Sequence, residues 1–237
     1  LISNYCGKIV SIDDFLYKKH YSDILINSKP DFFNLHSNKI KKINKKKCKF
    51  LLGPHYAILN NNIKKKAKQN VFKIVFYSGG SGNLNIFKGI IKNLIKKNNI
   101  FNNKVIIQII VGPYSKNISG IVKITELHKN IIAIFNPKYI NNILINSDLL
   151  IATAGVVSFE AAFCKIPSLL FQINNNQKTD FLSMQLLGHY LILKKEDLKK
   201  INKISNLIFL LIKNYKRTKK LSQNPKFEID GKGMDTL

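Results

Sequence analysis

A glycine-rich segment follows an apolar, strand-like run in the middle of the chain. The residues read KIVFYSGGSGN over 73–83, with Gly79, Gly80 and Gly82 set around Ser81. A glycine loop lets the backbone approach an anion closely, and a helix that starts beyond it directs free N–H groups and its positive dipole end toward that anion. The loop lacks the Gly-Lys-Ser/Thr ending of a P-loop and does not fit the G-x-G-x-x-G fingerprint. Taken alone, it is consistent with a phosphate cradle or with a tight turn.

A second small-residue turn lies further along, in the segment ATAGVVSFE over 152–160. Here an apolar strand runs into Gly155, and the short helix expected after it carries Ser158 and Glu160 close to its start. A carboxylate in the first turn of a helix can simply complement the helix dipole, a contribution of about 0.3–1 kcal/mol. It can equally accept hydrogen bonds from both hydroxyls of a ribose. Both interpretations stay open at this point.

A third group of polar residues follows another apolar strand. The segment FQINNNQ over 171–177 places amide side chains, among them Asn176 and Gln177, directly after the strand. Amides can hydrogen-bond sugar hydroxyls and acyl groups. Because the chain is rich in asparagine throughout, this run alone is weak evidence for a site.

Alternating strand-like and helix-like segments must position these loops. From residue 72 onward, apolar runs predict strands at 72–77, 104–112, 130–135, 148–153, 168–173 and 189–193. Apolar spacing and helix-start signals predict helices at 83–99, 137–147, 157–165, 177–188 and 195–215. Strands that are apolar on both faces and separated by helices form parallel sheets covered on both sides, so we expect a doubly wound, Rossmann-like α/β domain. In such a sheet ligands bind at the carboxyl ends of the strands, where all three loops fall.

The first part of the chain has a different pattern. Strands are predicted at 7–14 and 22–28, and an apolar run at 48–59 is interrupted by Gly53 and Pro54. The polar, charged stretch at 63–70 reads as a linker. We therefore predict that residues 1–62 are the C-terminal remainder of a first Rossmann-like domain. Residues 71–237 would form a nucleotide-binding Rossmann-like domain with a C-terminal helix.

Composition narrows the class of protein. The net charge is +26, but Arg217 is the single arginine among 39 basic residues. Richness in Lys, Asn and Ile is typical of AT-biased coding, whereas nucleic-acid readers generally use arginine for bidentate contacts, so we expect no specific nucleic-acid partner. No apolar run reaches the ~18 residues that cross a bilayer. The three cysteines are far apart and lack a C-x-x-C pair, so we expect a cytoplasmic protein without a metal site or cofactor.

Together the three loops resemble the nucleotide-binding half of GT-B proteins, and the match continues in order along almost the whole chain. Further segments resemble one GT-B family, the UDP-sugar hydrolases of pseudaminic acid synthesis; they are IDDFLYKKHYSDILINS, LLGPHYAIL, PSLLFQINNNQ and IDGKGMDTL. That family releases UDP from a diacetamido-trideoxy-altropyranose. The resemblance implies two Rossmann-like, doubly wound parallel sheets, the first incomplete in this sequence. It also implies a nucleotide-sugar hydrolase whose substrate is a UDP-sugar.

The resemblance further implies roles for particular residues. Those expected to bind the nucleotide are Gly79, Gly80, Ser81, Gly155, Ser158 and Glu160. The first three would cradle the pyrophosphate, the next two would line the nucleotide pocket, and the last would take the ribose hydroxyls. Asn176 and Gln177 would face the sugar. Tyr56 falls in the LLGPHYAIL segment, near the expected cleft between the domains.

Several positions depart from the family pattern. Gly82 stands where the family usually has Asp, Asn175 replaces a Glu, and Val156 and Val157 replace small hydroxyl residues. The family's N-terminal Gly-His segment, whose His is the expected general base, has no counterpart around any of the five histidines. No catalytic residue is therefore assigned. We expect the sequence to begin inside the family's length, with the base in the part before it.

Two other functions stay open. A GT-B glycosyltransferase, such as the one that makes peptidoglycan lipid II, would use the same nucleotide-binding half and hand the sugar to an acceptor. A non-catalytic nucleotide-binding homologue would keep the pocket without the chemistry. The sequence leaves the identity of the sugar and the oligomeric state open.

Overall fold

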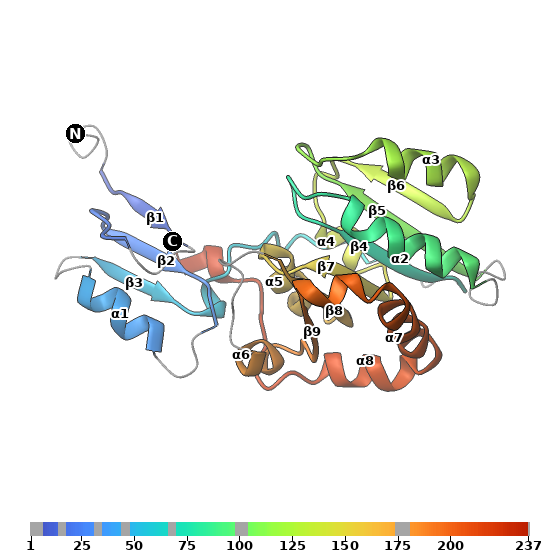
Figure 1. Ribbon diagram of the computed structural model, residues 1–237. Helices are drawn as coiled ribbons and strands as arrows, with labels where there is room; N and C mark the ends of the chain where they lie inside the picture. Colours follow the sequence, from blue (N-terminus) through green and yellow to red (C-terminus); the bar gives the residue numbers. More distant parts are fainter. Residues whose placement is uncertain are drawn as a thin grey trace.

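The computed structural model describes residues 7–13, 18–30, 35–43, 48–65, 70–97, 104–173 and 181–236. Its strands form two separate sheets, one of three strands and one of six, and the paired strands are parallel in both. The two sheets lie next to one another along the length of the molecule (Figure 1). This confirms the predicted α/β architecture with two parallel sheets.

The small sheet consists of β1 (Val10–Ile12), β2 (Ile24–Asn27) and β3 (Lys49–Leu52), in that order. Its central strand is buried along its whole length. On one face Leu25 packs with Ile40 of α1 (Leu35–Ile43), and on the other Ile26 packs with Leu51. Because successive side chains of a strand point to opposite faces, a β2 strand that is buried along its whole length fits a sheet that is covered on both sides.

The large sheet has the strand order β6-β5-β4-β7-β8-β9. Its strands are β4 (Phe72–Tyr77), β5 (Val105–Val111), β6 (Ile131–Phe135), β7 (Leu149–Thr153), β8 (Ser168–Gln172) and β9 (Leu191–Lys194). The chain builds outward from β4 through β5 and β6, then returns to the other side of β4 and builds outward through β7, β8 and β9. The order reverses between β4 and β7, which makes this gap the topological switch point where doubly wound sheets bind ligands.

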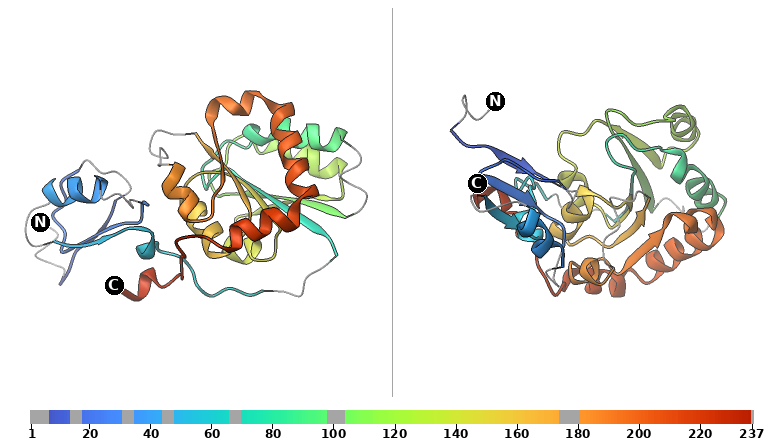
Figure 2. Two further views of the ribbon diagram at one scale, coloured as in Figure 1. Left: turned by 90° about the horizontal axis from the view of Figure 1, so that it is seen from below. Right: turned by 60° about the vertical axis from the view of Figure 1, so that its left-hand side comes forward.

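Helices cover both faces of the large sheet (Figures 1 and 2). On one face, α2 (Asn85–Lys96), α3 (Ser119–Leu127) and α7 (Ile201–Lys213) enclose a core that includes Phe76, Phe87 and Phe171. On the other face, α4 (Asn141–Leu144), α5 (Val156–Phe163) and α6 (Phe181–Leu186) enclose a second core. The apolar positions that predicted α2, such as Ile90 and Leu94, are fully buried.

Some helices differ from the prediction. The sequence analysis missed α3, whose nine residues include Gly120 and no capping side chain, so that Ile121 and Ile124 alone mark its buried side. The helix predicted at 195–215 begins as a 3-10 turn (Lys195–Lys199) before α7, and α8 (Tyr215–Gln223) continues past its predicted end. Within the described part of the chain, none of the helices has the length and apolarity needed to cross a membrane.

Two segments join the sheets. Ala57 and Leu59, which follow the 3-10 helix η2 (Pro54–Tyr56), are buried in the second core together with Ile229 of the C-terminal tail. The tail ends in the 3-10 helix η6 (Gly233–Thr236), which contacts η2 beside the small sheet (Figure 2). The limits predicted for the two domains and for the linker at 63–70 stay a prediction.

Candidate functional site

A cleft of about 600 Å³ opens at the switch point, between the carboxyl ends of β4 and β7. Its lining comes from the loop after β4, the loop between β5 and α3, and the turn from β7 into α5. The predicted nucleotide-binding residues that line it are Gly79, Ser81, Gly155 and Glu160. The fold therefore brings the first two predicted loops together at one edge of the sheet.

Two glycines of the first loop are required by its backbone. Gly79 has a φ of 90°, a left-handed conformation that L side chains rarely adopt. At Gly82 a β-carbon would lie 1.8 Å from the carbonyl oxygen of Ser78, so no side chain fits unless the backbone moves. This accounts for one departure from the family pattern, because the loop as it is folded here cannot accommodate the usual Asp.

The hydrogen bonds of the same loop occupy its carbonyl groups and leave N–H groups available. The carbonyls of Gly80 and Gly82 accept hydrogen bonds from the amides of Tyr114 and Lys116, at 2.9 and 3.0 Å. By contrast, none of the described residues accepts a hydrogen bond from the amide of Gly80 or Ser81. Available amides beside the N-terminus of α2 provide the donors and the positive dipole end that an anion requires.

Ser158 stabilises the turn into α5. Its Oγ accepts a hydrogen bond from the amide of Gly155 at 3.3 Å, and its own amide donates to the Gly155 carbonyl at 3.0 Å. Ser158 is buried and is not part of the lining of the cleft. Its contacts are those of a helix cap, and the direct nucleotide contact that the resemblance implies stays a prediction.

His189, which the sequence analysis did not single out, holds the same turn. Its Nε2 lies 2.7 Å from the carbonyl oxygen of Ser158, and because a carbonyl can only accept, Nε2 carries the proton. Burial lowers the pKa of His189 to about 4, and the hydrogen bond to Ser158 offsets this only in part, so the ring is neutral at neutral pH. No local pattern could have revealed the contact, since the two residues are 31 positions apart.

Glu160 places a carboxylate in the cleft from α5. None of the described residues donates a hydrogen bond to this side chain or forms an ion pair with it. Burial raises the pKa of Glu160 to about 7. At the end of β4, burial and then the charge of Glu160 raise the pKa of Tyr77. A half-buried carboxylate whose acceptor sites are unfilled suits a ligand with two adjacent hydroxyl donors.

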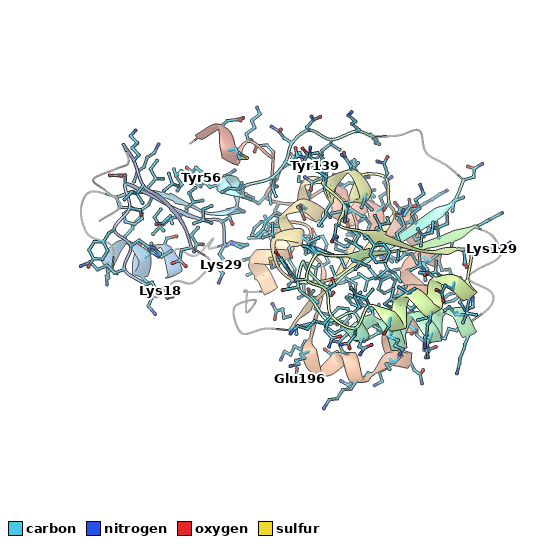
Figure 3. The ribbon with its side chains drawn as sticks, turned by 90° about the horizontal axis from the view of Figure 1, so that it is seen from above. Lys18, Lys29, Tyr56, Lys129, Tyr139 and Glu196 are labelled. Atoms are coloured by element: carbon cyan, nitrogen blue, oxygen red, sulfur yellow. The ribbon has the colours of Figure 1, made fainter. Side chains whose placement is uncertain are left out.

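A second cavity, of about 380 Å³, lies between the small sheet and the large sheet. It shares Ala154, Gly155 and Val156 with the cleft, so the two spaces meet at the turn into α5. Its lining is mostly apolar, and the side of the small sheet contributes Lys29 and Tyr56 (Figure 3). Tyr56 thus lies at the boundary between the sheets, where its segment in the sequence suggested.

A polar cluster lies at the carboxyl edge of the small sheet. His20 Nε2 lies 2.7 Å from Asp13 Oδ2, and Asn27 Nδ2 donates to the carbonyl of Asp13 at 2.6 Å. Asn27 Oδ1 accepts a hydrogen bond from the amide of Lys29 at 3.0 Å. The cluster therefore fixes the backbone where it enters the lining of the second cavity.

The remaining predicted residues are placed as follows. Asn176 and Gln177, predicted to face the sugar, lie outside the described residues, as does Asn175. Gly80 belongs to the first loop without lining the cleft. In the part of the chain that the structure describes, no group of three or more His, Cys, Asp or Glu side chains could hold a metal ion. The roles assigned from the resemblance stay predictions.

Sequence comparison finds one distant relative. No family model matches the chain. The uncharacterised protein MJ1062 of Methanocaldococcus jannaschii is 25% identical over 195 residues. The match covers 75% of this chain but only 38% of that protein, so the chain spans well under half of the curated relative.

Solved structures resemble the whole fold. The S. aureus MnaA structure with UDP matches with a TM-score of 0.60 at 12% identity, covering 90% of this chain and 57% of that one. A UDP-N-acetylglucosamine 2-epimerase matches at 0.58 with 15% identity, covering 90% and 55%. The spinosyn rhamnosyltransferase SpnG, complexed with thymidine diphosphate, matches at 0.56 with 12% identity, covering 90% and 66%. At these identities the likeness establishes the fold alone, and that fold is GT-B-like, as predicted.

Proposed function

We propose that this chain is part of a nucleotide-sugar enzyme and that UDP binds in the cleft at the switch point. The observation that carries the proposal is that the Glu160 carboxylate and the glycine loop line one cleft. A nucleoside diphosphate has both the adjacent hydroxyls that a carboxylate accepts and the anion that loop amides and a helix N-terminus stabilise. The nucleoside diphosphates in the MnaA and SpnG structures support this choice.

For the reaction, we propose hydrolysis that releases UDP from a UDP-diacetamido-trideoxy sugar in pseudaminic acid synthesis. The ordered motifs of the sequence support it. Water attacks the anomeric carbon, the C–O bond to the diphosphate breaks, and UDP leaves with the bonding electron pair. The loop amides and the N-terminus of α2 stabilise the leaving diphosphate. The sugar occupies the second cavity, Asn176 and Gln177 are the residues proposed to bind it, and none of the described residues is assigned as the base that activates water.

A thermal-shift measurement tests the nucleotide site. UDP at a hundredfold excess over its Kd stabilises the folded state by about 2.7 kcal/mol, which raises the Tm by several degrees. We expect Glu160→Ala to abolish this rise, because the ribose loses its acceptor. Glu126→Ala, on the exposed side of α3, is the matched control and should keep it. A wild-type Tm that does not change in millimolar UDP would refute the site.

A glycosyltransferase is the second candidate. The mostly apolar lining of the cavity beside the cleft is compatible with an apolar acceptor. Analysis of the products formed from a UDP-sugar separates the two reactions. Free sugar identifies a hydrolase, acceptor-linked sugar identifies a transferase, and UDP binding without turnover identifies a non-catalytic homologue.

A further inference from the structure

The lining of the cleft at the switch point includes one basic and one acidic residue that do not form an ion pair with each other. Lys116 is the one cationic side chain among its described lining residues, and Glu160 is the one carboxylate. No ion pair joins them in the described part of the chain. Two unpaired charges of opposite sign in one cleft fit a ligand that offers hydroxyl donors to the carboxylate and an anion to the ammonium group.

The backbone of Lys116 is fixed against the glycine loop. Its amide donates to the carbonyl of Gly82 at 3.0 Å, and its carbonyl accepts from the amide of Leu84 at 3.1 Å. The next residue, Asn117, has a φ of 61° and donates from its side chain to Asn83 Oδ1 at 2.9 Å. The lysine therefore starts from a defined position on the same side of the cleft as the loop amides.

A second observation on this side of the cleft is independent of charge. Ser78 lines the cleft and is 6% exposed, yet its Oγ has no hydrogen-bond partner among the described residues. A buried hydroxyl without a partner costs free energy, which a ligand that supplies an acceptor oxygen recovers. Ser78 thus contributes to the wall of the cleft a buried hydroxyl that has no acceptor among the described residues.

We propose that Lys116 and Ser78 bind the diphosphate of the nucleotide, Lys116 by charge and Ser78 by donating a hydrogen bond from Oγ. The inference rests on the proposed function and adds the residues that distinguish a diphosphate from a monophosphate. When the C–O bond breaks, the leaving diphosphate gains negative charge, and Lys116 stabilises that charge together with the loop amides. Glu160 then takes the ribose at the other side of the cleft.

Calorimetric titration of the chain with UDP, UMP and uridine tests the assignment. We expect Lys116→Met to weaken UDP binding by about 10–100-fold and UMP binding less, and to leave uridine binding unchanged. Added salt should weaken UDP binding less in this variant than in the wild type, because one charge contact is gone. Lys123→Met removes an exposed charge from the neighbouring α3 and should bind UDP within about twofold of wild type.

Ser78→Ala provides a test that a merely structural role would fail. Because Oγ makes no hydrogen bond in the described structure, its removal should leave the Tm unchanged or raise it, while UDP binding weakens by about 3–10-fold. If both variants bind UDP as tightly as the wild type, the assignment is wrong.

Inorganic pyrophosphate separates this inference from the nucleotide proposal. If the wild type binds pyrophosphate through Lys116 but shows no preference for UDP, the uridine site fails and the anion site stands. If it binds neither, both fail.

Discussion

Glu160 makes nucleotide binding depend on pH. With its pKa raised to about 7 by burial, about a tenth of this carboxyl is ionised at pH 6 and about nine tenths at pH 8. Ribose hydroxyls donate to the ionised form, so the UDP affinity of the wild type should rise about tenfold over this range relative to Glu160→Gln. The comparison cancels the titration of the phosphate itself. Titrations of both proteins at pH 6, 7 and 8 check this, and parallel profiles would contradict it.

The same carboxyl affects stability without ligand. Its folded-state pKa is raised above the ordinary value of 4.5, so its contribution is fully present below pH 4.5 and is lost as the pH rises to about 7. His189 acts in the opposite direction. Its pKa is lowered to about 4, so its contribution is present above pH 6.5 and is lost as the pH falls toward 4. The Tm difference between wild type and Glu160→Gln isolates the first effect.

A residue of the candidate site could be predicted from the sequence only where the residues that position it are close to it along the chain. Glu160 was singled out because a strand, a glycine and a helix start place it locally, and its predicted role at the ribose came from the family resemblance. Lys116 could not be proposed from the sequence, because one lysine among 39 basic residues carries no signal of its own. No local sequence pattern shows that Ser78 Oγ lacks a hydrogen-bond partner among the described residues. Nor does one show that His189 contacts a carbonyl 31 positions away.

At the scale of elements, the loop between β4 and α2 depends on Gly82. A β-carbon there would overlap the carbonyl of Ser78, so Gly82→Ala should destabilise the fold by about 1–3 kcal/mol and weaken UDP binding, because the loop must shift. Gly155→Ala is the control for stability. Gly155 has open space around it and an extended φ of 170° that any residue adopts, so its Tm should stay near that of wild type. Equal losses of Tm would argue against the steric explanation.

The elements also show which hydrophobic patterns allow a helix or strand to be predicted from the sequence. The strand β4 and the helix α2 were predicted because their apolar residues repeat over whole elements that are fully buried on one side. Helix α3 was not predicted, because the sequence of a short helix with a glycine and few apolar positions resembles that of a loop. Such a helix becomes stable only when it packs on the sheet. It matters for the site, since the loop that leads into α3 carries Lys116.

At the scale of the whole molecule, the C-terminal tail is one of the two segments that join the sheets. A β-carbon at Gly233 would lie 2.4 Å from the carbonyl oxygen of Ala57 and 2.9 Å from that of His55, so η6 packs against η2 backbone to backbone. Phe227 continues the connection through a ring contact with His55, at 4.2 Å between centroids. We expect Gly233→Ala to release η6 from η2, with a loss of about 1–3 kcal/mol.

Hydrogen exchange locates the effect of this substitution. Amides of η2 and of the segment at 57–65 should exchange faster in Gly233→Ala, while those of α2 and β6 keep their protection, because the first core of the large sheet, to which they belong, does not contain the changed contact. Met234→Ala, which shortens an exposed side chain one residue further on, should exchange like wild type. The second cavity lies between the sheets and includes residues 56–59, so a released tail should also weaken binding of a UDP-sugar more than binding of UDP. Uniformly faster exchange in both sheets would instead mean that the tail stabilises the large sheet itself.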